Sequence, residues 1–272
     1  MQEQVRQWLE QKTVDVFIGC ISRYGHALPH VFSRDNLQDC AALVPGWHRY
    51  PLEKFALDLA RAHPEWTIGL LARDCTKRAL NVLTAWNQVE AERIRPLELS
   101  CCPSPLGSRS DCSYLQPEAA GSGKQAFGLD PNLSLEEAEA LSPEEQARRW
   151  SYEFSKCIKC YGCRNICPVC FCRECSLEHP ELIHTGQQLT EVPLFHLVRA
   201  AHMAGRCIDC GLCEQACPMD IPLRLLYRKV NAVVEATFGY QAGASADMPP
   251  LSTLEQAPGL EPQPLQAAVS SG

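Results

Sequence analysis

The sequence lacks the features of a membrane protein and of a nucleic-acid-binding protein. No run reaches the eighteen apolar residues that a membrane span needs. Basic residues are in the minority, with 25 Lys and Arg against 32 Asp and Glu and a formal net charge of −7. Binding to a nucleic-acid backbone or an anionic membrane surface favours a basic footprint. We therefore expect no membrane span and no nucleic-acid partner.

Several common signatures of targeting and catalysis are also missing. The opening MQEQVRQWLEQKTVDVF has no apolar core and no small-residue cleavage site, so it does not read as a secretion signal. We find no Walker phosphate loop, no G-x-G-x-x-G fingerprint and nothing that resembles a hydrolase triad. These absences favour a cytoplasmic location and direct attention to the residue type that is abundant, cysteine.

Seventeen cysteines in 272 residues is an unusual number. Cytoplasmic thiols stay reduced, so the count favours metal ligands over disulfides. Eight of these cysteines form two copies of C-x₂-C-x₂-C-x₃-C-P, the bacterial pattern for [4Fe–4S] clusters. The first run is Cys157, Cys160, Cys163, Cys167 and Pro168, and the second is Cys207, Cys210, Cys213, Cys217 and Pro218.

The spacing predicts how the two runs share their ligands. Three thiolates two residues apart can reach three corners of a cubane from one tight loop, and in two-cluster proteins the fourth ligand comes from the other run. Two structural zinc sites are the weaker alternative, because zinc prefers separated CxxC pairs. We therefore assign Cys157, Cys160, Cys163 and Cys217 to one cluster, and Cys207, Cys210, Cys213 and Cys167 to the other.

Charged side chains and further cysteines crowd the same region. The nearby basic residues could offset the charge of thiolate-ligated clusters, or they could form a solvated or docking surface. Three more cysteines follow the first run and leave three possibilities open: thiols lining the cluster pocket, ligands of a third metal centre, or a redox-active pair within C-x-x-C. The basic residues are Lys156, Lys159, Arg164, Arg173 and Arg206, and the extra cysteines are Cys170, Cys172 and Cys175.

Residues 1–116 read as an α/β domain. Short apolar runs predict strands at 14–19, 66–72 and, more weakly, 93–99. Periodic apolar residues predict helices at 36–44, 51–63 and 76–92. Strands that alternate with helices imply a parallel, Rossmann-like sheet.

Cysteines follow the predicted strands of this domain. The carboxyl ends of parallel strands share one edge of a sheet, where open α/β sheets bind ligands. A second thiol-rich site is therefore one interpretation. The other is that free cysteines serve as small core residues, which we expect for Cys40 inside a helix. The candidates at the edge are Cys20, Cys75, Cys101, Cys102 and, nearby, Cys112.

The rest of the chain divides by composition. Residues 117–141 combine Gly, Ser and Pro and are expected to be a linker. Residues 142–240 are expected to be mainly helical, starting at Ser142 as N-cap and Pro143 at the first helical position, with further helices at 194–205 and 221–240. Leu194, Leu197, Val198 and Ala201 mark the apolar face expected for the first of these. Residues 241–272 are expected to be a flexible tail or an extended arm that lies on a partner.

Three stretches carry a family resemblance. LLARDCTKRALNVLTAWNQVEAERI followed by SCC is similar to proteins related to the β subunit of coenzyme F420-reducing hydrogenase and formate dehydrogenase. CIKCYGCRNICPVCFCREC and FHLVRAAHMAGRCIDCGLCEQACPMDIPLRLL resemble bacterial 4Fe-4S dicluster domain proteins with an α-helical ferredoxin-type cluster domain. The sequence departs from the pattern by having Asp74-Cys75-Thr76 where Gly-Cys-Asp is expected.

The resemblance implies an electron-transfer component of an oxidoreductase complex. Heterodisulfide reductase-like, hydrogenase or formate dehydrogenase subunits would be its partners, and two [4Fe–4S] clusters its cofactors. Two alternatives remain: a flavin-dependent oxidoreductase with FAD in the amino-terminal domain, and a thiol-based redox sensor. FAD and a third metal centre are further possible cofactors, but we cannot name the residues that would bind either of them from the sequence.

Overall fold

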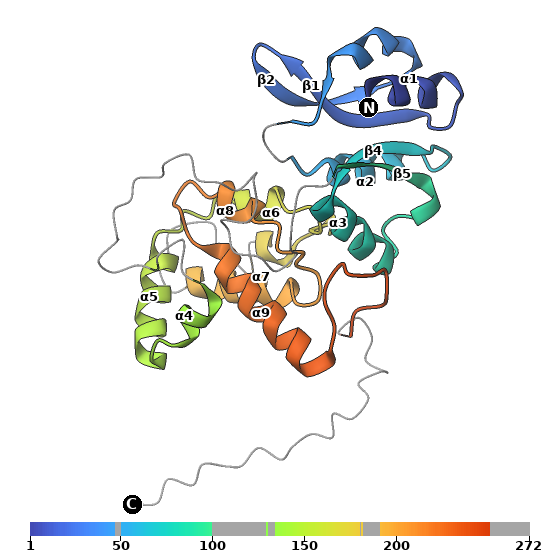
Figure 1. Cartoon of the computed structure of the whole chain (residues 1–272). Coiled ribbons are helices and arrows are strands. Elements are labelled where there is room, and N and C mark those ends of the chain that lie inside the picture. The colour runs from blue at the N-terminus through green and yellow to red at the C-terminus, as the bar shows by residue number, and fades with distance from the viewer. Residues whose placement is uncertain (47–49, 100–128, 130–133, 180, 182–190, 251–272) are drawn as a thin grey trace, which may run out of the picture.

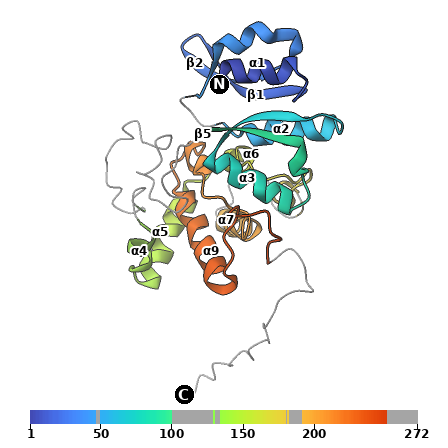
Figure 2. The same cartoon turned by 45° about the vertical axis from the view of Figure 1, so that its right-hand side comes forward.

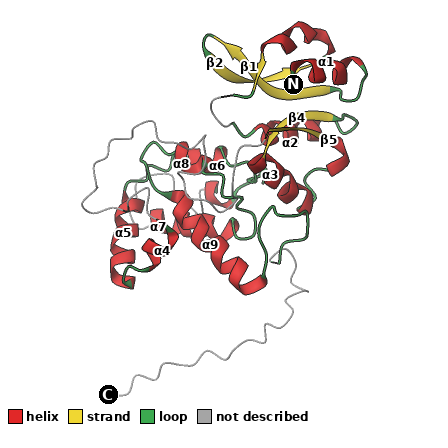
Figure 3. Cartoon of the chain, in the orientation of Figure 1, coloured by secondary structure: helices red, strands yellow, loops and turns green. Residues whose placement is uncertain are grey.

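The computed structural model describes residues 1–46, 50–99, 129, 134–179, 181 and 191–250. These residues form an amino-terminal α/β unit and a carboxy-terminal helical unit, drawn one above the other in Figure 1. Figure 3 shows that the described strands all belong to the amino-terminal unit. The predicted combination of an α/β unit with a mainly helical unit is therefore confirmed at this coarse level.

Three neighbouring strands of the sheet run parallel. They are β1 (Val16–Arg23), β4 (Ile68–Arg73) and β5 (Ile94–Leu99), with β4 in the middle. Helix α2 (Leu52–Ala62) precedes β4, and helix α3 (Asp74–Ala85) connects β4 to β5. Parallel strands need such crossover connections, which is why alternating strand and helix patterns predicted this part of the sheet correctly.

The sheet as a whole is mixed, and the prediction of a parallel, Rossmann-like sheet is wrong at one edge. Strands β2 (His26–Phe32) and β3 (Leu43–Val44) both pair with β1 in the antiparallel direction. Tyr24 and Gly25 join β1 to β2 with φ values of 54° and 78°. A two-residue hairpin turn with both central residues at positive φ matches the twist of the strands.

Some helices differ from their predicted limits. The segment predicted as a helix over 36–44 is a 3₁₀ helix, η1 (Arg34–Ala42), which is capped by Ser33 as its sequence suggests. The helix predicted over 76–92 ends at Ala85 because Asn87 adopts a left-handed φ of 52°, and a short 3₁₀ turn η2 (Ala91–Arg93) follows. Helix α1 (Gln2–Glu10) was not predicted; it buries Val5 and Leu9.

The helical unit contains both long and very short helices. Its α5 (Pro143–Ser155) begins as predicted, with the Ser142 side chain accepting a hydrogen bond from the Glu145 amide at 3.2 Å. The two helices predicted later in the unit are α7 (Glu191–His202) and α9 (Leu223–Phe238). The remaining elements are α4 (Leu135–Glu139), α6 (Gly162–Asn165), η4 (Ser176–Glu178) and α8 (Leu212–Gln215).

The apolar face expected for α7 is wrong for most of its residues, although Val198 packs with the cysteine runs. Leu194 and Leu197 are 52% and 54% exposed, whereas Phe195, His196 and Arg199 are buried. The helix therefore turns a face with two polar side chains toward the interior. Burial of polar groups is costly unless they have hydrogen-bond or charge partners. The site that this face adjoins should therefore supply partners for His196 and Arg199.

Helix α3 joins the two units. Figures 1 and 2 both show it between the sheet and the helical unit. Its Leu83 packs in the core of the sheet, while Cys75, Ala79 and Val82 pack with the cysteine runs. The side chain of Asn81 donates to the Gly243 carbonyl at 2.9 Å, so the start of the stretch expected to be a tail contacts this helix.

The described helices include none that is both long enough and apolar enough to cross a membrane. Helix α4 lies within the stretch 117–141 that was expected to be a linker; residues 117–128 and 130–133 of that stretch, and residues 251–272 of the expected tail, lie outside the described residues.

Candidate metal centre

The repeat in the sequence is also a repeat in the backbone. Each run forms a loop through its first two cysteines, followed by a one-turn helix that contains the third, α6 in the first run and α8 in the second. Backbone hydrogen bonds of the first run recur fifty positions later in the second. Arg164 N to Tyr161 O, Cys167 N to Arg164 O and Cys170 N to Cys167 O are matched by Glu214 N to Gly211 O, Cys217 N to Glu214 O and Asp220 N to Cys217 O.

Left-handed residues flank the second cysteine of each loop. Lys159 and Tyr161 have φ of 50° and 58°, and Asp209 and Gly211 have 52° and 74°. Alternation of left- and right-handed backbone turns successive N–H groups toward one side and forms a concavity suited to an anion. The Lys159 amide accordingly donates to the Cys157 sulfur at 3.4 Å. Non-glycine residues rarely adopt this conformation, so three strained positions mark these loops as functional.

Two cavities lie beside the loops. The first cavity, of about 320 Å³, is lined by Cys157, Cys160, Cys163 and Cys217 together with His196 and Phe195. The second cavity, of about 370 Å³, is lined by Cys167, Cys207, Cys210 and Cys213 together with Arg199 and Tyr227. Each cavity thus combines three cysteines of one run with the last cysteine of the other, which is the grouping that the sequence predicts.

The thiols in these cavities differ in exposure. Cys160 is exposed, whereas Cys163 and Cys167 are each only 8% exposed. Burial raises the pKa of the Cys163 thiol to about 11, an effect that the nearby Arg199 guanidinium partly opposes. Burial likewise raises the pKa of Cys167 and Cys207. Free thiols here would stay protonated at neutral pH, so binding of a metal centre must release their protons.

Cavities that suit an anionic iron–sulfur group should offer hydrogen-bond donors that have no other partner. In the described residues the two ring nitrogens of His196, the Nε of Arg199 and the hydroxyl of Tyr227 are buried and have no hydrogen-bond partner. All three side chains line one of the two cavities. Thiolate and sulfide sulfurs accept hydrogen bonds, and such bonds tune cluster potentials. The eight thiols and these donors therefore fit two thiolate-ligated clusters.

The cysteine thiols are spaced more widely than the ligands of a single metal ion. Across the described ranges, no three His, Cys, Asp or Glu side chains converge on a point that could hold one metal ion. Each thiolate around a cubane binds a different iron atom, so its four cysteines lie further apart than the four ligands of one zinc ion.

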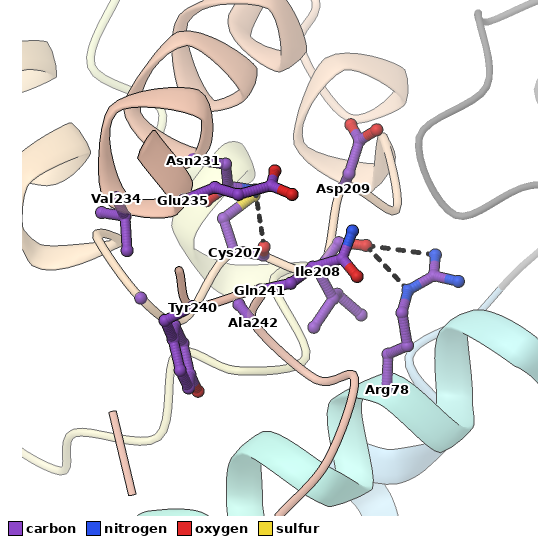
Figure 4. Close-up of a pocket in the computed structure, with 11 residues that line it drawn as sticks. Arg78, Cys207, Ile208, Asp209, Asn231, Val234, Glu235, Tyr240, Gln241 and Ala242 are labelled. Carbon is purple, nitrogen blue, oxygen red and sulfur yellow. Dashed lines mark hydrogen bonds between the residues drawn. The ribbon is translucent and has the colours of Figure 1, made fainter. Parts of the chain in front are cut away.

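An ion pair and a third pocket surround the second cavity. Asp209 accepts two hydrogen bonds from Arg224, at 2.6 and 3.0 Å, and both side chains are buried. The adjoining pocket, of about 400 Å³, is shown in Figure 4. There Arg78 of α3 donates to the Ile208 carbonyl at 3.2 and 3.1 Å, and Asn231 of α9 donates to the Cys207 carbonyl at 2.8 Å. These bonds hold the second loop between α3 and α9.

The three extra cysteines line neither cavity. The sulfur of Cys170 accepts a long hydrogen bond of 3.8 Å from Arg199, and Cys175 precedes η4. Cys172 is exposed. The structure therefore places Cys170 next to the cation that lines the second cavity. Of the C-x-x-C pair, Cys172 lies at the surface and Cys175 is partly buried against the core of the helical unit.

Of the amino-terminal cysteines that the structure describes, Cys75 lies apart from Cys20 and Cys40. Cys20 and Cys40 are fully buried in the hydrophobic core around the sheet, where burial raises the pKa of both thiols. Cys75 lies in the first turn of α3 and packs instead with Cys163 and Cys167. Cys101, Cys102 and Cys112, the other candidates for a thiol-rich edge, lie outside the described residues.

Comparison with known proteins agrees with this geometry. Residues 153–221 match the family of 4Fe-4S dicluster domains. The cofactors are therefore two [4Fe–4S] clusters, and the chain carries an iron–sulfur domain of the electron-transfer type.

Two curated relatives extend the likeness. The chain is 42% identical over 108 residues to the F420-dependent formate dehydrogenase subunit beta of Methanocaldococcus jannaschii, covering 40% of this chain and 28% of the relative. It is 44% identical over 101 residues to the F420-dependent formate dehydrogenase 1 subunit beta of Methanococcus maripaludis, covering 37% and 26% respectively. The chain thus spans about a quarter of the length of these relatives.

Proposed function

We propose that this chain is an electron-transfer component of a larger redox complex and that it relays single electrons through its two clusters. Cys157, Cys160, Cys163 and Cys217 hold one cluster, and Cys207, Cys210, Cys213 and Cys167 hold the other. The observation that carries the proposal is the distribution of these eight cysteines over two cavities, three from one run and one from the other in each.

The surroundings of the two cavities suggest a path for electrons. Cys160 of the first cavity is exposed, so this side can face a redox partner. The second cavity lies beneath the α/β unit, since Arg78 of α3 binds the loop between Cys207 and Cys210. The α/β unit then serves as the docking element for the rest of the complex. Electrons would pass between the surface near Cys160 and the side covered by α3.

The partners are proposed from the relatives. Because two similar proteins are β subunits of F420-dependent formate dehydrogenases, a formate dehydrogenase-type complex is the first choice of partner. Heterodisulfide reductase-like and hydrogenase complexes are the alternatives that the cluster domain permits. The cytoplasm is the proposed place of action, because thiols stay reduced there.

The decisive experiment measures iron, acid-labile sulfide and flavin per chain in protein purified without oxygen, with EPR of the reduced form. About eight iron and eight sulfide without flavin, and EPR signals of two interacting reduced clusters, support the proposal. Tightly bound flavin would instead favour an oxidoreductase that binds its own FAD. Zinc in place of iron would overturn the proposal.

A further inference from the structure

Arg199 occupies a position shared by the two cavities. Its side chain is 2% exposed and lines the second cavity. Its Nη2 donates to the carbonyl of Cys163 at 2.9 Å, and the thiol of that same residue lines the first cavity. One guanidinium thus adjoins the cavity of one cysteine group and the backbone of the other.

This buried cation has no carboxylate partner in the described part of the chain. There it contacts the Cys163 carbonyl, the Cys170 sulfur at 3.8 Å and the ring of Tyr227 at 5.8 Å. Its Nε has no hydrogen-bond partner there. Removing a charge from water costs several kcal/mol unless an opposite charge or full hydrogen bonding compensates. A nearby anion is therefore required.

Arg224 provides an internal comparison. It lines the same second cavity and is also buried, but its charge is neutralised by two hydrogen bonds to Asp209. Arg228 lies 3.8 Å from the same Asp209 carboxylate, so these two arginines both have a carboxylate partner. Arg199, in contrast, supplies an uncompensated positive charge to the thiols that surround it.

The groups that face Arg199 identify the missing anion. It lines the second cavity together with Cys167 and Cys213, and it donates to the Cys163 carbonyl, so it lies near proposed ligands of both clusters. Clusters ligated by thiolates are anionic. We propose that Arg199 is the common counter-ion of the two clusters and a positioning residue that raises the reduction potential of both, more strongly at the second cavity.

The direction of the effect follows from charge. Reduction adds one electron, and hence one negative charge, to a cluster. A fixed positive charge in a site of low dielectric constant stabilises the reduced form more than the oxidised form. It also weakens the repulsion between two reduced clusters. The Tyr227 hydroxyl, which is buried and unpartnered, adds a hydrogen-bond donor to the second cavity, as the His196 ring does to the first.

This inference rests on the proposed function, so its test begins with protein that contains about eight iron per chain. Arg199→Gln removes the charge while keeping a hydrogen-bond donor, and Arg199→Lys keeps the charge. EPR-monitored redox titration measures the potential of each cluster. We expect Arg199→Gln to lower the equilibrium constant for reduction of the second-cavity cluster at least tenfold. For a one-electron couple this corresponds to a reduction potential lower by about 59 mV. The first-cavity cluster should move less, and Arg199→Lys should retain more than half of the wild-type effect at both.

Arg206→Gln is the matched control, because it makes the same change in net charge close to Cys207. Arg206 stacks on Trp86 at 3.6 Å and lines neither cavity. Its replacement should change the equilibrium constant for reduction of each cluster less than threefold. Equal shifts from Arg206→Gln and Arg199→Gln, or no shift from the latter, would overturn the inference.

A variant that loses iron is also informative. If Arg199→Gln cannot retain its clusters, Arg199→Lys decides the matter, since it restores the charge without the planar guanidinium. Retention of about eight iron with near wild-type potentials supports a counter-ion. Loss of iron from Arg199→Lys as well would show that only the shape of the guanidinium matters and would overturn the inference. Wild-type protein that lacks eight iron would instead count against the proposed function.

Discussion

Cys217 lines the same cavity as Cys157, although helix α7 separates the two residues in the chain. The relationship is reciprocal, because Cys167 lines the cavity of Cys207. The loops are held in this arrangement by close contact between α6 and α8. A Cβ atom at Gly162 would lie only 3.0 Å from the Ala216 carbonyl oxygen, so the smallest residue stands where the two runs meet.

Exchange of the fourth ligand gives a direct prediction for single cysteine variants. Cys217→Ser should remove or convert the cluster of Cys157, Cys160 and Cys163, even though Cys217 belongs to the second run. Iron should fall from about eight to about four per chain, and the EPR signal of the cluster held by Cys207 should remain. Iron analysis with EPR checks this.

Cys172→Ser is the control, because Cys172 is exposed and lines neither cavity; its iron content should match the wild type. If Cys217→Ser abolished the signal of the cluster held by its own run and spared the other, the ligand assignment would be wrong.

Arg78→Met should loosen the second loop. The variant removes the two hydrogen bonds to the Ile208 carbonyl. A hydrogen bond from a charged donor contributes at most about 1.5–3 kcal/mol to stability. We expect release of the second-cavity cluster to an iron chelator to become at least several-fold faster. The absorbance decay at visible wavelengths reports this rate.

Lys77→Met serves as its control on the same helix. Lys77 pairs with Asp74 and Glu98 at 3.2 Å in an exposed position, and such pairs contribute about 0–1 kcal/mol. Equal release rates for the two variants would mean that the bond to Ile208 does not hold the loop.

Gly243→Ala should destabilise the contact between the helical unit and α3. Gly243 has a φ of +81°, and a Cβ atom there would lie 2.6 Å from the Arg78 carbonyl oxygen. Backbone strain of about 1–2 kcal/mol then adds to a backbone clash that no side-chain movement relieves. We expect a lower midpoint in denaturant-induced unfolding of the loaded protein.

Gly239→Ala separates strain from clash. Gly239 also has a positive φ, of +62°, but no atom lies within 4 Å of its Cβ position. This variant should carry only the strain and lose about 1–2 kcal/mol. A midpoint for Gly243→Ala at or above that of Gly239→Ala would show that the close approach to Arg78 is absent in solution.

Removal of the clusters should affect the two units differently. All of the proposed cluster cysteines except Cys160 belong to or pack against the second hydrophobic core, while the core of the sheet contains none of them. After iron chelation, amide hydrogen exchange should accelerate in α6, α8 and the adjoining end of α7. Amides of β1 and β4 should keep their protection, because their core is intact. Loss of protection throughout the sheet would show that the two cores unfold as one.

The sequence predicts the chemistry of this protein better than its architecture. Short spacing rules determine which cysteines can share a cubane, and they lead to the same groups of four that line the two cavities. The hairpin between β1 and β2 was missed because Tyr24 takes a positive φ in a turn without the usual Asn-Gly or Asp-Gly pair.

The side chains around the cavities were missed for a different reason. Apolar periodicity assumes that a buried helix face is hydrophobic, and it therefore selected Leu194 and Leu197 on α7. The true inner face carries His196 and Arg199, since it borders the cavities. Polar residues at helical spacing directly before a cysteine run were the available signal.

The crossed arrangement of the two runs has a consequence for biogenesis. Each cavity contains one cysteine of the other run. Neither run alone can therefore provide all four cysteines of a site during synthesis. The first loop must wait for Cys217, the last cysteine of the second run, whereas the second cavity has its four cysteines slightly earlier, once Cys213 has left the ribosome. Damage that displaces one loop likewise withdraws a ligand from the site of the other loop, so it weakens both sites.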